Sequence, residues 1–421
     1  MASFPFAHAT HPQWSVAVSL VLAQLGAQRA AAPPLGVLYI TDHFAAHAQE
    51  VLDQLMAGLP EVTDWVGAVG LGIAATGVEY WDEPALAVML VDVPADQFQV
   101  FNGVTPLPAA VAGLQPGGGS RFVAQTALVH ADAHTPDLPE LIVELAQRTR
   151  SAAVFGGVVY GRERCVQFAH SSRGRLSGRG VSPGVLTGGL SGVAFGPDIE
   201  VWTRVTQGCR PMGAVHTVTR THDNVVLELD GVGALDRLLS DANVSLAQPD
   251  VAVLRLRQVL AGIRPMDGQF GQRPAPDIAS EEALALGAET RVRHIIGLDT
   301  ARRGFVLSEC LQPGEQLVFC ERHAEAARMD LLHMCTALRE DLAALDGQPK
   351  SVCGALYISC NGRGGAHFGA DHAELQCVQA ALGDIPLVGL FAGGEIAGQQ
   401  LYGYTGVLTV FVADVASGAV S

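Results

Sequence analysis

Two glycine-rich turns near the C-terminus hold the residues best suited to chemistry. The first turn, Cys360-Asn361-Gly362-Arg363-Gly364, follows the apolar run 354–358, which is typical of a buried strand. The second turn reads Phe391-Ala392-Gly393-Gly394-Glu395-Ile396. Glycine turns at strand ends can leave backbone N–H groups pointing at one spot, where Arg363 and Glu395 would add opposite charges. We predict that this spot is a pocket for a small polar molecule.

The two charges fit an amino acid or a related small carboxylate. Arginine grips a carboxylate with two parallel N–H donors, and glutamate accepts hydrogen bonds from an ammonium group. We therefore expect Arg363 to hold the ligand carboxylate and Glu395 to hold its amine. The alternative is that the two side chains pair with each other, or with the backbone, and only hold two loops together. The predicted ligand-binding residues are Cys360, Asn361, Gly362, Arg363, Gly364, Gly393, Gly394 and Glu395.

The same region offers a catalytic alternative. Cys360 could act as the nucleophile of a thiol-dependent or hydrolytic enzyme, with His367 or His372 as its base. Against this, a small thiol in a tight turn is commonly a buried filler. No G-x-S-x-G elbow occurs, because Ser191 lies in G-L-S-G. Four candidate metal ligands in this loop match no zinc spacing; they are Cys360, His367, Asp371 and His372. We predict no catalytic residue, no metal and no cofactor.

The charge balance excludes several classes of partner. The 421 residues carry 42 acidic and 26 basic side chains, which gives a net charge of −16. Nucleic acids and anionic membranes need concentrated lysine and arginine, so we expect neither as a partner. Lys350 is the only lysine, which excludes a G-x-x-x-x-G-K-[ST] phosphate loop and leaves one candidate for a Schiff-base lysine.

Cysteine usage and hydropathy predict a soluble protein of the cytoplasm. The eight cysteines form no C-x-x-C pair, and we expect reduced thiols, mostly in the core. No segment reaches the roughly 18 uninterrupted apolar residues of a membrane span. The apolar stretch 14–25 is interrupted by polar residues, which favours an amphipathic helix over a signal peptide.

A strand–helix–strand–strand unit recurs three times, over residues 36–93, 127–195 and 354–415. Because the first connection in each copy passes through a helix, the first two strands should run parallel, and the second connection resembles a hairpin. This pattern predicts an α/β protein of mixed sheets with packed helices. Chance similarity among strands rich in valine, glycine and alanine is the alternative explanation. The expected helices cover 45–59, 138–150 and 373–382.

The copies divide between two similar domains. We expect an N-terminal helix within residues 1–32, a first domain over 33–245 that holds two copies, and a second domain over 246–421 that holds the third. The Pro/Gly-rich stretch 262–279 is the best candidate for a boundary or a surface loop. The run Gly117-Gly118-Gly119-Ser120 has the composition of a flexible linker.

One loop contrasts with the acidic background. Residues 162–184 contain five arginines and one acidic residue, Glu163. This local surplus predicts attraction for an anionic ligand or for an acidic partner surface, and the alternative is a solvated hairpin flap. The arginines are Arg162, Arg164, Arg173, Arg175 and Arg179.

Together these motifs resemble the FIST family, with its paired FIST N and FIST C domains. The C-terminal match rests on residues 360–364, 386–396 and 401–406, with support from 295–299. The N-terminal match rests on residues 155–157, 188–193, 207–211 and 228–231. The resemblance implies a sensory module that binds amino acids or related metabolites in bacterial signalling. No kinase, cyclase or DNA-binding segment is recognisable. We therefore expect a signal to pass through a partner protein.

Overall fold

The computed structural model describes residues 3–28, 33–102, 122–172, 184–245, 247, 249–264, 290–344 and 350–414. The linker-like run 117–120, the stretch 265–279 and three of the loop arginines, Arg173, Arg175 and Arg179, lie outside these residues. The chain forms two compact units. Unit 1 comprises Met1–Val205 and Leu331–Ser421, and unit 2 comprises Thr206–Asp330. The division of the sequence near residue 245 stays a prediction.

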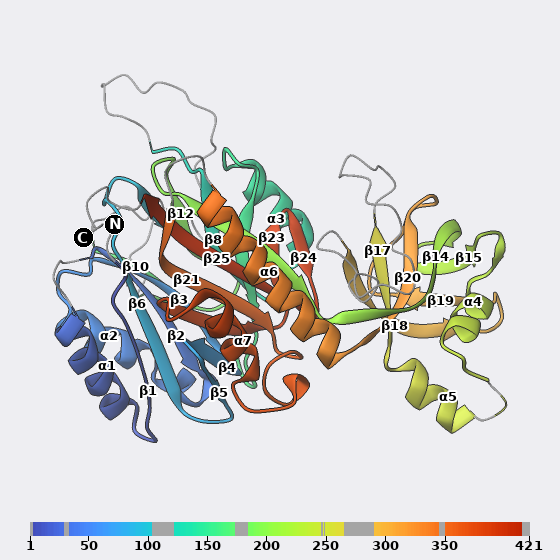
Figure 1. The fold of residues 1–421 in the computed structure, drawn as a ribbon, viewed down its shortest axis with the longest axis horizontal. Helices are drawn as coiled ribbons and strands as arrows, with labels where there is room; N and C mark the ends of the chain where they lie inside the picture. Colours follow the sequence, from blue (N-terminus) through green and yellow to red (C-terminus); the bar gives the residue numbers. More distant parts are fainter. Residues whose placement is uncertain are drawn as a thin grey trace. The chain divides into compact units, whose positions relative to one another are not determined.

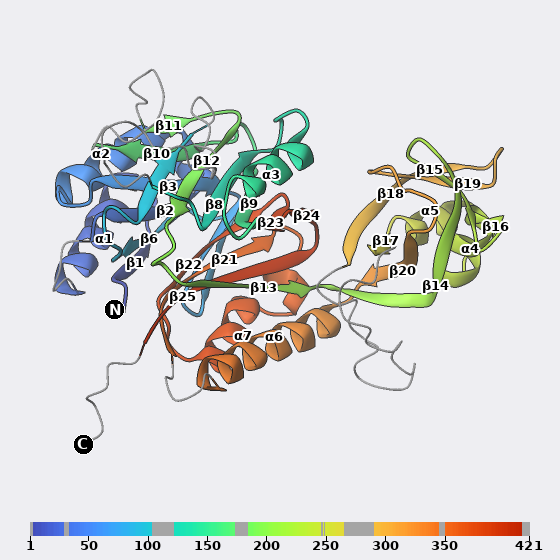
Figure 2. The same ribbon diagram turned by 90° about the horizontal axis from the view of Figure 1, so that it is seen from above.

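All three copies of the repeat lie in unit 1, and each forms the centre of a six-stranded sheet (Figures 1 and 2). The first sheet has the order β1 (Phe6–Thr10), β6 (Ala85–Val91), β2 (Leu35–Thr41), β3 (Asp64–Gly70), β10 (Gln167–Ser171), β11 (Val185–Leu186). The second has the order β7 (Phe98–Phe101), β12 (Leu190–Phe195), β8 (Thr126–Asp132), β9 (Val154–Val159), β23 (Glu395–Gly398), β24 (Gln400–Tyr402). The third has the order β13 (Val201–Gln207), β25 (Thr405–Asp414), β21 (Lys350–Cys360), β22 (Leu387–Ala392), β4 (Gly72–Ala75), β5 (Val78–Trp81).

The three sheets share one plan. In each, the first and second strands of a copy run parallel, as in β2–β3, β8–β9 and β21–β22. The last strand of the copy runs antiparallel to the first, as in β6–β2, β12–β8 and β25–β21. The predicted mixed α/β sheets are therefore confirmed, and the first connection does pass through a helix.

Each sheet is completed by a hairpin from another copy, which the sequence did not predict. The β4–β5 hairpin of the first copy pairs with β22 in the third sheet. The β10–β11 hairpin of the second copy pairs with β3, and the β23–β24 hairpin of the third copy pairs with β9. The exchange is cyclic, so every copy both gives and receives a hairpin. The turns that follow the second strands carry the chain from one sheet into the next.

Helices cover the outward face of each sheet in unit 1 (Figure 2). In α2, the buried residues Val51, Leu52 and Leu55 recur at helical spacing, which gives this segment one apolar face. The predicted helices over 45–59, 138–150 and 373–382 are confirmed as α2, α3 and α7. The elements are α1 (Trp14–Gln28), η1 (Asp42–His47) and α2 (Ala48–Gly58) on the first sheet, α3 (Leu138–Gln147) on the second, and α6 (Ala324–Ala344), η3 (Gly365–Phe368) and α7 (Ala373–Leu382) on the third.

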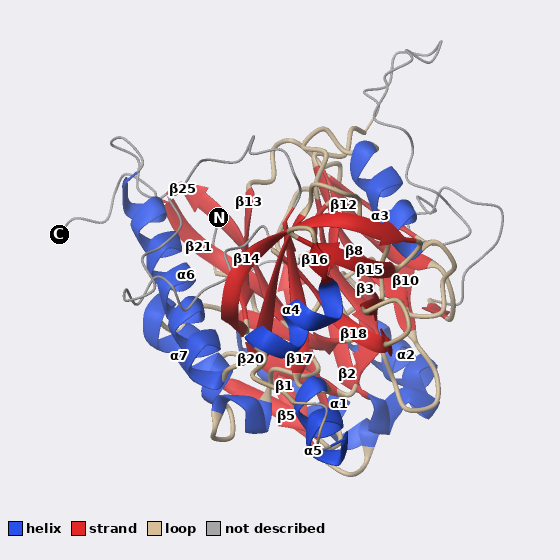
Figure 3. Cartoon of the chain, turned by 90° about the vertical axis from the view of Figure 1, so that its right-hand side faces the viewer, coloured by secondary structure: helices blue, strands red, loops and turns tan. Residues whose placement is uncertain are grey.

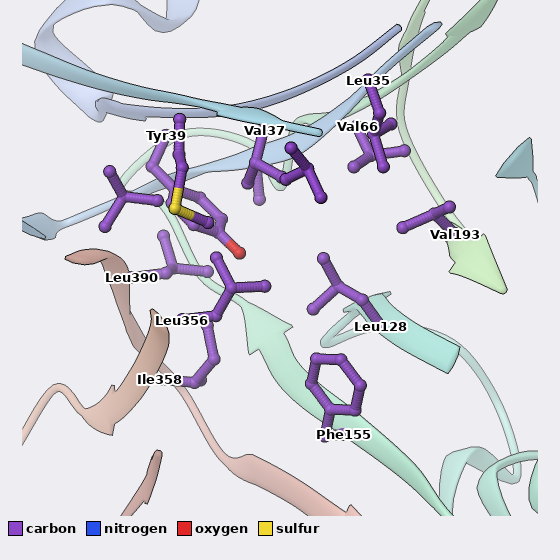
Figure 4. Close-up of a cluster of buried hydrophobic side chains, with 14 of the residues drawn as sticks. Leu35, Val37, Tyr39, Val66, Leu128, Phe155, Val193, Leu356, Ile358 and Leu390 are labelled. Carbon is purple, nitrogen blue, oxygen red and sulfur yellow. The ribbon is translucent and has the colours of Figure 1, made fainter. Parts of the chain in front are cut away.

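The inward faces of the three sheets share one core (Figure 4). Tyr39 and His130 bring polar groups into this core, where Tyr39 Oη lies 3.0 Å from His130 Nε2. Burial lowers the pKa of His130 to about 3, so the ring stays neutral at physiological pH. The apolar members include Leu35, Val37 and Val66 from the first sheet, Leu128, Phe155 and Val193 from the second, and Leu356, Ile358 and Leu390 from the third.

Unit 2 contains a closed ring of six antiparallel strands, β14–β20–β17–β18–β19–β15, which the β14–β15 pairing completes. Phe305, Phe319 and Leu238 belong to its apolar core. The ring leaves few unpaired strand edges, which is a stable solution for a small antiparallel sheet. Its elements (Figures 2 and 3) are β14 (Cys209–His222), β15 (Val225–Leu229), β16 (Val232–Gly233), α4 (Ala234–Asp241), α5 (Pro249–Leu256), β17 (Val259–Arg264), β18 (Arg291–Asp299), β19 (Gly304–Leu307) and β20 (Gln316–Arg322).

Glycines occupy equivalent positions in the second strands of the three copies. A Cβ atom added to Gly67 would lie 1.7 Å from the carbonyl oxygen of Leu38 in the first strand. The corresponding distance is 1.9 Å for Gly156 and Val129, and 2.2 Å for Gly389 and Tyr357. Real Cβ atoms do not approach a backbone oxygen so closely, so each position requires glycine. This recurrence supports duplication of the unit over chance similarity.

Gly156→Ala should therefore be severely destabilising. Its φ of +147° disfavours a side chain, and the new methyl group would overlap the Val129 carbonyl oxygen. We expect a loss of more than about 3 kcal/mol in the free energy of unfolding, or no folded protein. The matched control is Gly26→Ala in α1, where no atom lies within 4 Å and a gain of roughly 0.5–1 kcal/mol is expected. Denaturant unfolding of both variants measures the difference, and equal stabilities would contradict the argument.

Candidate functional site

The two glycine-rich turns lie side by side in unit 1. Cys360 ends β21, and Glu395 begins β23 directly after the Gly393-Gly394 turn. Because β21 and β22 are parallel neighbours, their carboxyl ends meet at one edge, and the Asn361 N–H donates to the Ala392 carbonyl oxygen at 2.8 Å. The structure thus brings the predicted residues together. Their roles as ligand contacts stay a prediction.

Arg363 is buried and engaged with a carboxylate. Only 1% of its surface is exposed, and its Nε donates to Glu374 Oε1 at 2.9 Å. Tyr357 Oη and Ser359 Oγ donate to the same oxygen, at 2.7 and 2.9 Å. The guanidinium carbon also lies 5.3 Å from the centre of the Phe368 ring. Arg363 therefore forms an ion pair with Glu374 of α7, and its charge also acts on the nearby Glu395 carboxyl.

Glu395 is fully buried on the neighbouring turn. Its Oε2 accepts hydrogen bonds from the Thr405 N–H and hydroxyl, at 3.0 and 2.7 Å. Burial raises the pKa of this carboxyl to about 8, although the donors of Thr405 act in the opposite direction. Among the described residues, Oε1 accepts no conventional hydrogen bond, and the weakly donating thiol of Cys360 lies beside the carboxyl group.

Two further buried oxygens in this region lack a hydrogen-bond donor among the residues that the structure describes. They are Asn361 Oδ1 on the first turn and Glu374 Oε2 on α7. A buried acceptor without a donor costs about 1–3 kcal/mol, so three such oxygens in one region need an explanation. A bound molecule with N–H donors would satisfy them.

The first turn is supported by a carboxylate that the sequence did not reveal. Glu79 lies on β5, in the hairpin given by the first copy, and accepts from the Gly365 N–H at 2.8 Å and the Glu374 N–H at 3.1 Å. It thereby caps the start of α7. Its neighbour Trp81 packs against Gly364, where an added Cβ would lie 2.4 Å from the indole. No sequence signal links residue 79 to residue 365, because only the exchange of hairpins brings them together.

The thiol does not have the properties of an activated nucleophile. Burial, together with the nearby Glu395 charge, raises the pKa of Cys360 to about 12. His372 is engaged elsewhere, since its Nδ1 accepts from the Glu79 N–H at 3.0 Å. The candidate metal ligands of this loop do not converge on one point within the described part of the chain. These observations count against both the thiol enzyme and a metal centre at this turn.

Two other groups that the sequence suggested as ligand contacts, the Gly393 N–H and Arg162, bind to partners within the protein. The Gly393 N–H donates to the Val158 carbonyl oxygen at 2.8 Å, where the third copy enters the second sheet. Arg162 pairs with Asp42 at 3.0 Å and also with Asp82. This arginine therefore holds two loops of the first copy.

Two known domain families match the sequence of this chain. The FIST N domain model matches residues 34–232, and the FIST C domain model matches residues 252–398. The chain belongs to the FIST family. FIST domains are sensory, ligand-binding domains of signalling proteins.

Relatives of this FIST protein occur in mycobacteria. It is 30% identical over 388 residues to Uncharacterized protein Rv0628c of Mycobacterium tuberculosis, a match that covers 90% of this chain and 91% of that protein. It is 31% identical over 394 residues to Uncharacterized protein Mb0898c of Mycobacterium bovis, which covers 91% and 92% of the two chains. In the described part of this FIST protein, the helices are too short or too polar to cross a membrane.

Glu395 predicts a specific pH dependence of stability in this FIST protein. Its ordinary pKa is 4.5, and its pKa in the folded protein is about 8, so the folded state holds the proton longer than the unfolded state. The free energy of unfolding should therefore fall as pH rises from about 4.5 to about 8. Glu395→Gln removes this contribution. The difference in melting temperature, Glu395→Gln minus wild type, should therefore increase between pH 5 and pH 8.

The matched control is Glu140→Gln, at an exposed glutamate of α3. Its melting temperature should follow the wild-type curve across the same range. A Glu395→Gln curve parallel to the wild-type curve would contradict the raised pKa of the buried carboxyl.

Proposed function

We propose that the site formed by turns 360–364 and 393–395 binds a small metabolite with a cationic amine and a carboxylate, most simply an amino acid. The observation that carries the proposal is Glu395, which is fully buried and has one carboxyl oxygen without a conventional donor among the described residues. Membership of a sensory, ligand-binding family supports it. Glu395 and Asn361 would accept hydrogen bonds from the ligand amine.

Arg363 would receive the ligand carboxylate. Its Nε donates to Glu374, and its Nη1 makes a long contact of 3.5 Å to the Tyr404 carbonyl oxygen; together these contacts orient the guanidinium group. A guanidinium carries five N–H donors, so an arginine that is held by one carboxylate can bind another through its terminal nitrogens. Glu374 and Glu79 act as positioning residues in this arrangement, because they hold Arg363 and the turn in place.

Access to the site requires movement of the segment 361–372. Arg363 and Glu395 are buried, whereas Gly369, Ala370 and Asp371 on the same segment are exposed. Opening of this segment would admit the ligand, and the new hydrogen bonds would favour the closed form. Binding therefore shifts an equilibrium between open and closed forms, which a partner protein can recognise.

The signal would pass to a partner protein in the cytoplasm. All eight cysteines are described and are free thiols, which fits a reducing compartment. The alternative of a thiol-dependent or hydrolytic enzyme receives less support, because burial raises the pKa of Cys360 to about 12.

Calorimetry with a panel of small molecules tests the proposal. Each amino acid is compared with the amine and the carboxylic acid that lack one of its two charges. We expect an amino acid to bind best, and Glu395→Gln to weaken its affinity by about tenfold or more, since a buried ion pair is lost. Glu140→Gln should leave the affinity unchanged. No heat from any member of the panel, with correctly folded protein, would overturn the proposal.

The affinity for the amine should also depend on pH. A carboxyl with a pKa near 8 is mostly protonated at pH 6, and an ammonium group binds its ionised form. Binding should release a proton, and the affinity should rise by up to about tenfold per pH unit between pH 6 and pH 8. Calorimetry in buffers of different ionisation enthalpy measures the released proton. Affinity that is constant over this range would exclude Glu395 as the amine acceptor.

A further inference from the structure

A second cluster of reactive side chains lies at the carboxyl end of β8, in the second sheet of unit 1. Asp132 is the last residue of β8, His134 follows it, and Cys165 lies in the connection from β9 to β10. One ligand atom from each side chain lies within 4.8 Å of the other two. Asp132 and His134 are two residues apart, whereas Cys165 lies about 30 residues further along, and no zinc spacing revealed the group.

The distances within this cluster are close to those between ligands of a single metal ion. His134 Nδ1 lies 3.1 Å from Asp132 Oδ1 and 3.9 Å from Cys165 Sγ. Zinc bonded at about 2.0–2.3 Å in a tetrahedral arrangement holds its ligand atoms roughly 3.3–3.8 Å apart. Small adjustments of the three side chains would bring all three atoms to bonding distance of one ion.

The geometry does not fit a nucleophile with its base. In a cysteine–histidine–aspartate triad, the two ring nitrogens of the histidine serve different partners. Here the same nitrogen, His134 Nδ1, faces both the carboxylate and the thiol. Three atoms that face one point are arranged for a shared cation.

The surroundings orient two of the three ligands. Asp132 Oδ2 accepts from the Gly188 N–H at 2.9 Å, and Oδ1 accepts from the His134 N–H at 2.8 Å. The backbone N–H groups of Ala133 and Gly161, and the carboxylate of Asp132, lie within hydrogen-bonding reach of the Cys165 sulfur. Hydrogen bonds of this kind fix carboxylate and thiolate ligands around a metal. Asp132 and Cys165 are buried, whereas 84% of the His134 side chain is exposed.

We infer that Asp132, His134 and Cys165 form a binding site for a divalent transition-metal ion, with zinc as the best fit. Thiolate and imidazole select zinc over magnesium or calcium, which prefer oxygen ligands. Three protein ligands leave a fourth position, and the exposure of His134 opens that position to water or to a small anion. The site is distinct from the Arg363–Glu395 region and does not depend on amine binding there.

Cobalt and zinc titration of the full chain tests the inference. Protein without an affinity tag is stripped with a chelator, kept reduced, and titrated with Co²⁺. We expect one equivalent to bind and to give a near-ultraviolet thiolate-to-cobalt absorption band, which one equivalent of Zn²⁺ removes by displacement. Zinc should also raise the melting temperature, because it binds the folded state.

Matched variants assign the ligands. His134→Ala changes an exposed side chain, so it should fold normally and bind cobalt at least tenfold more weakly. Cys165→Ser should lose the thiolate band, whereas Cys310→Ser, at an exposed free cysteine, should keep it. His47→Ala, at an exposed histidine, should bind cobalt like the wild type. The inference is overturned if the wild type binds no stoichiometric metal, or if His134→Ala binds it as tightly.

Discussion

Strand pairing between copies is the constraint on which unit 1 depends. After its second strand, each copy turns out of its own sheet and completes another one, so the second strand pairs with a foreign hairpin. Without that hairpin, the edge of β3, β9 or β22 would present unpaired backbone groups. The three sheets also share one inward core, so packing and hydrogen bonding require the same arrangement.

This exchange also builds the candidate ligand site. Arg363 and Glu374 come from the third copy, whereas Glu79, which accepts from the Glu374 and Gly365 N–H groups, comes from the first. The second copy contributes Val158, whose carbonyl oxygen accepts from Gly393. All three copies therefore position one region, and a change in the pairing of any of them alters the region where the ligand is proposed to bind.

The sequence predicts the elements of the third copy well, because their signals are local. Apolar runs that end in glycine turns, and the helical spacing over 373–382, correspond to β21, β22 and α7. The proximity of the two glycine-rich turns could also be predicted, because the parallel strands β21 and β22 end at the same edge of the sheet. The partner of Arg363 and the position of Glu79 could not be predicted, since both depend on side-chain packing between distant segments.

The proposed metal site could not be predicted from the sequence for a related reason. Asp132 and His134 are close in the chain, but Cys165 joins them only after β9 has placed the next connection beside β8. Zinc spacing templates rely on pairs of cysteine or histidine ligands at short, fixed spacing, and neither His134 nor Cys165 belongs to such a pair. The raised pKa of Glu395 was equally hidden, because it results from burial and not from neighbours in the sequence.

The exchange of hairpins affects how the nascent chain folds during translation. β4 must wait for β22, which the ribosome produces roughly 15–60 s later at about 5–20 residues per second. Until then, the hairpin exposes an edge that could join a neighbouring polypeptide in aggregates. A holding chaperone that shields this edge during translation would keep each chain apart until its own β22 has been synthesised.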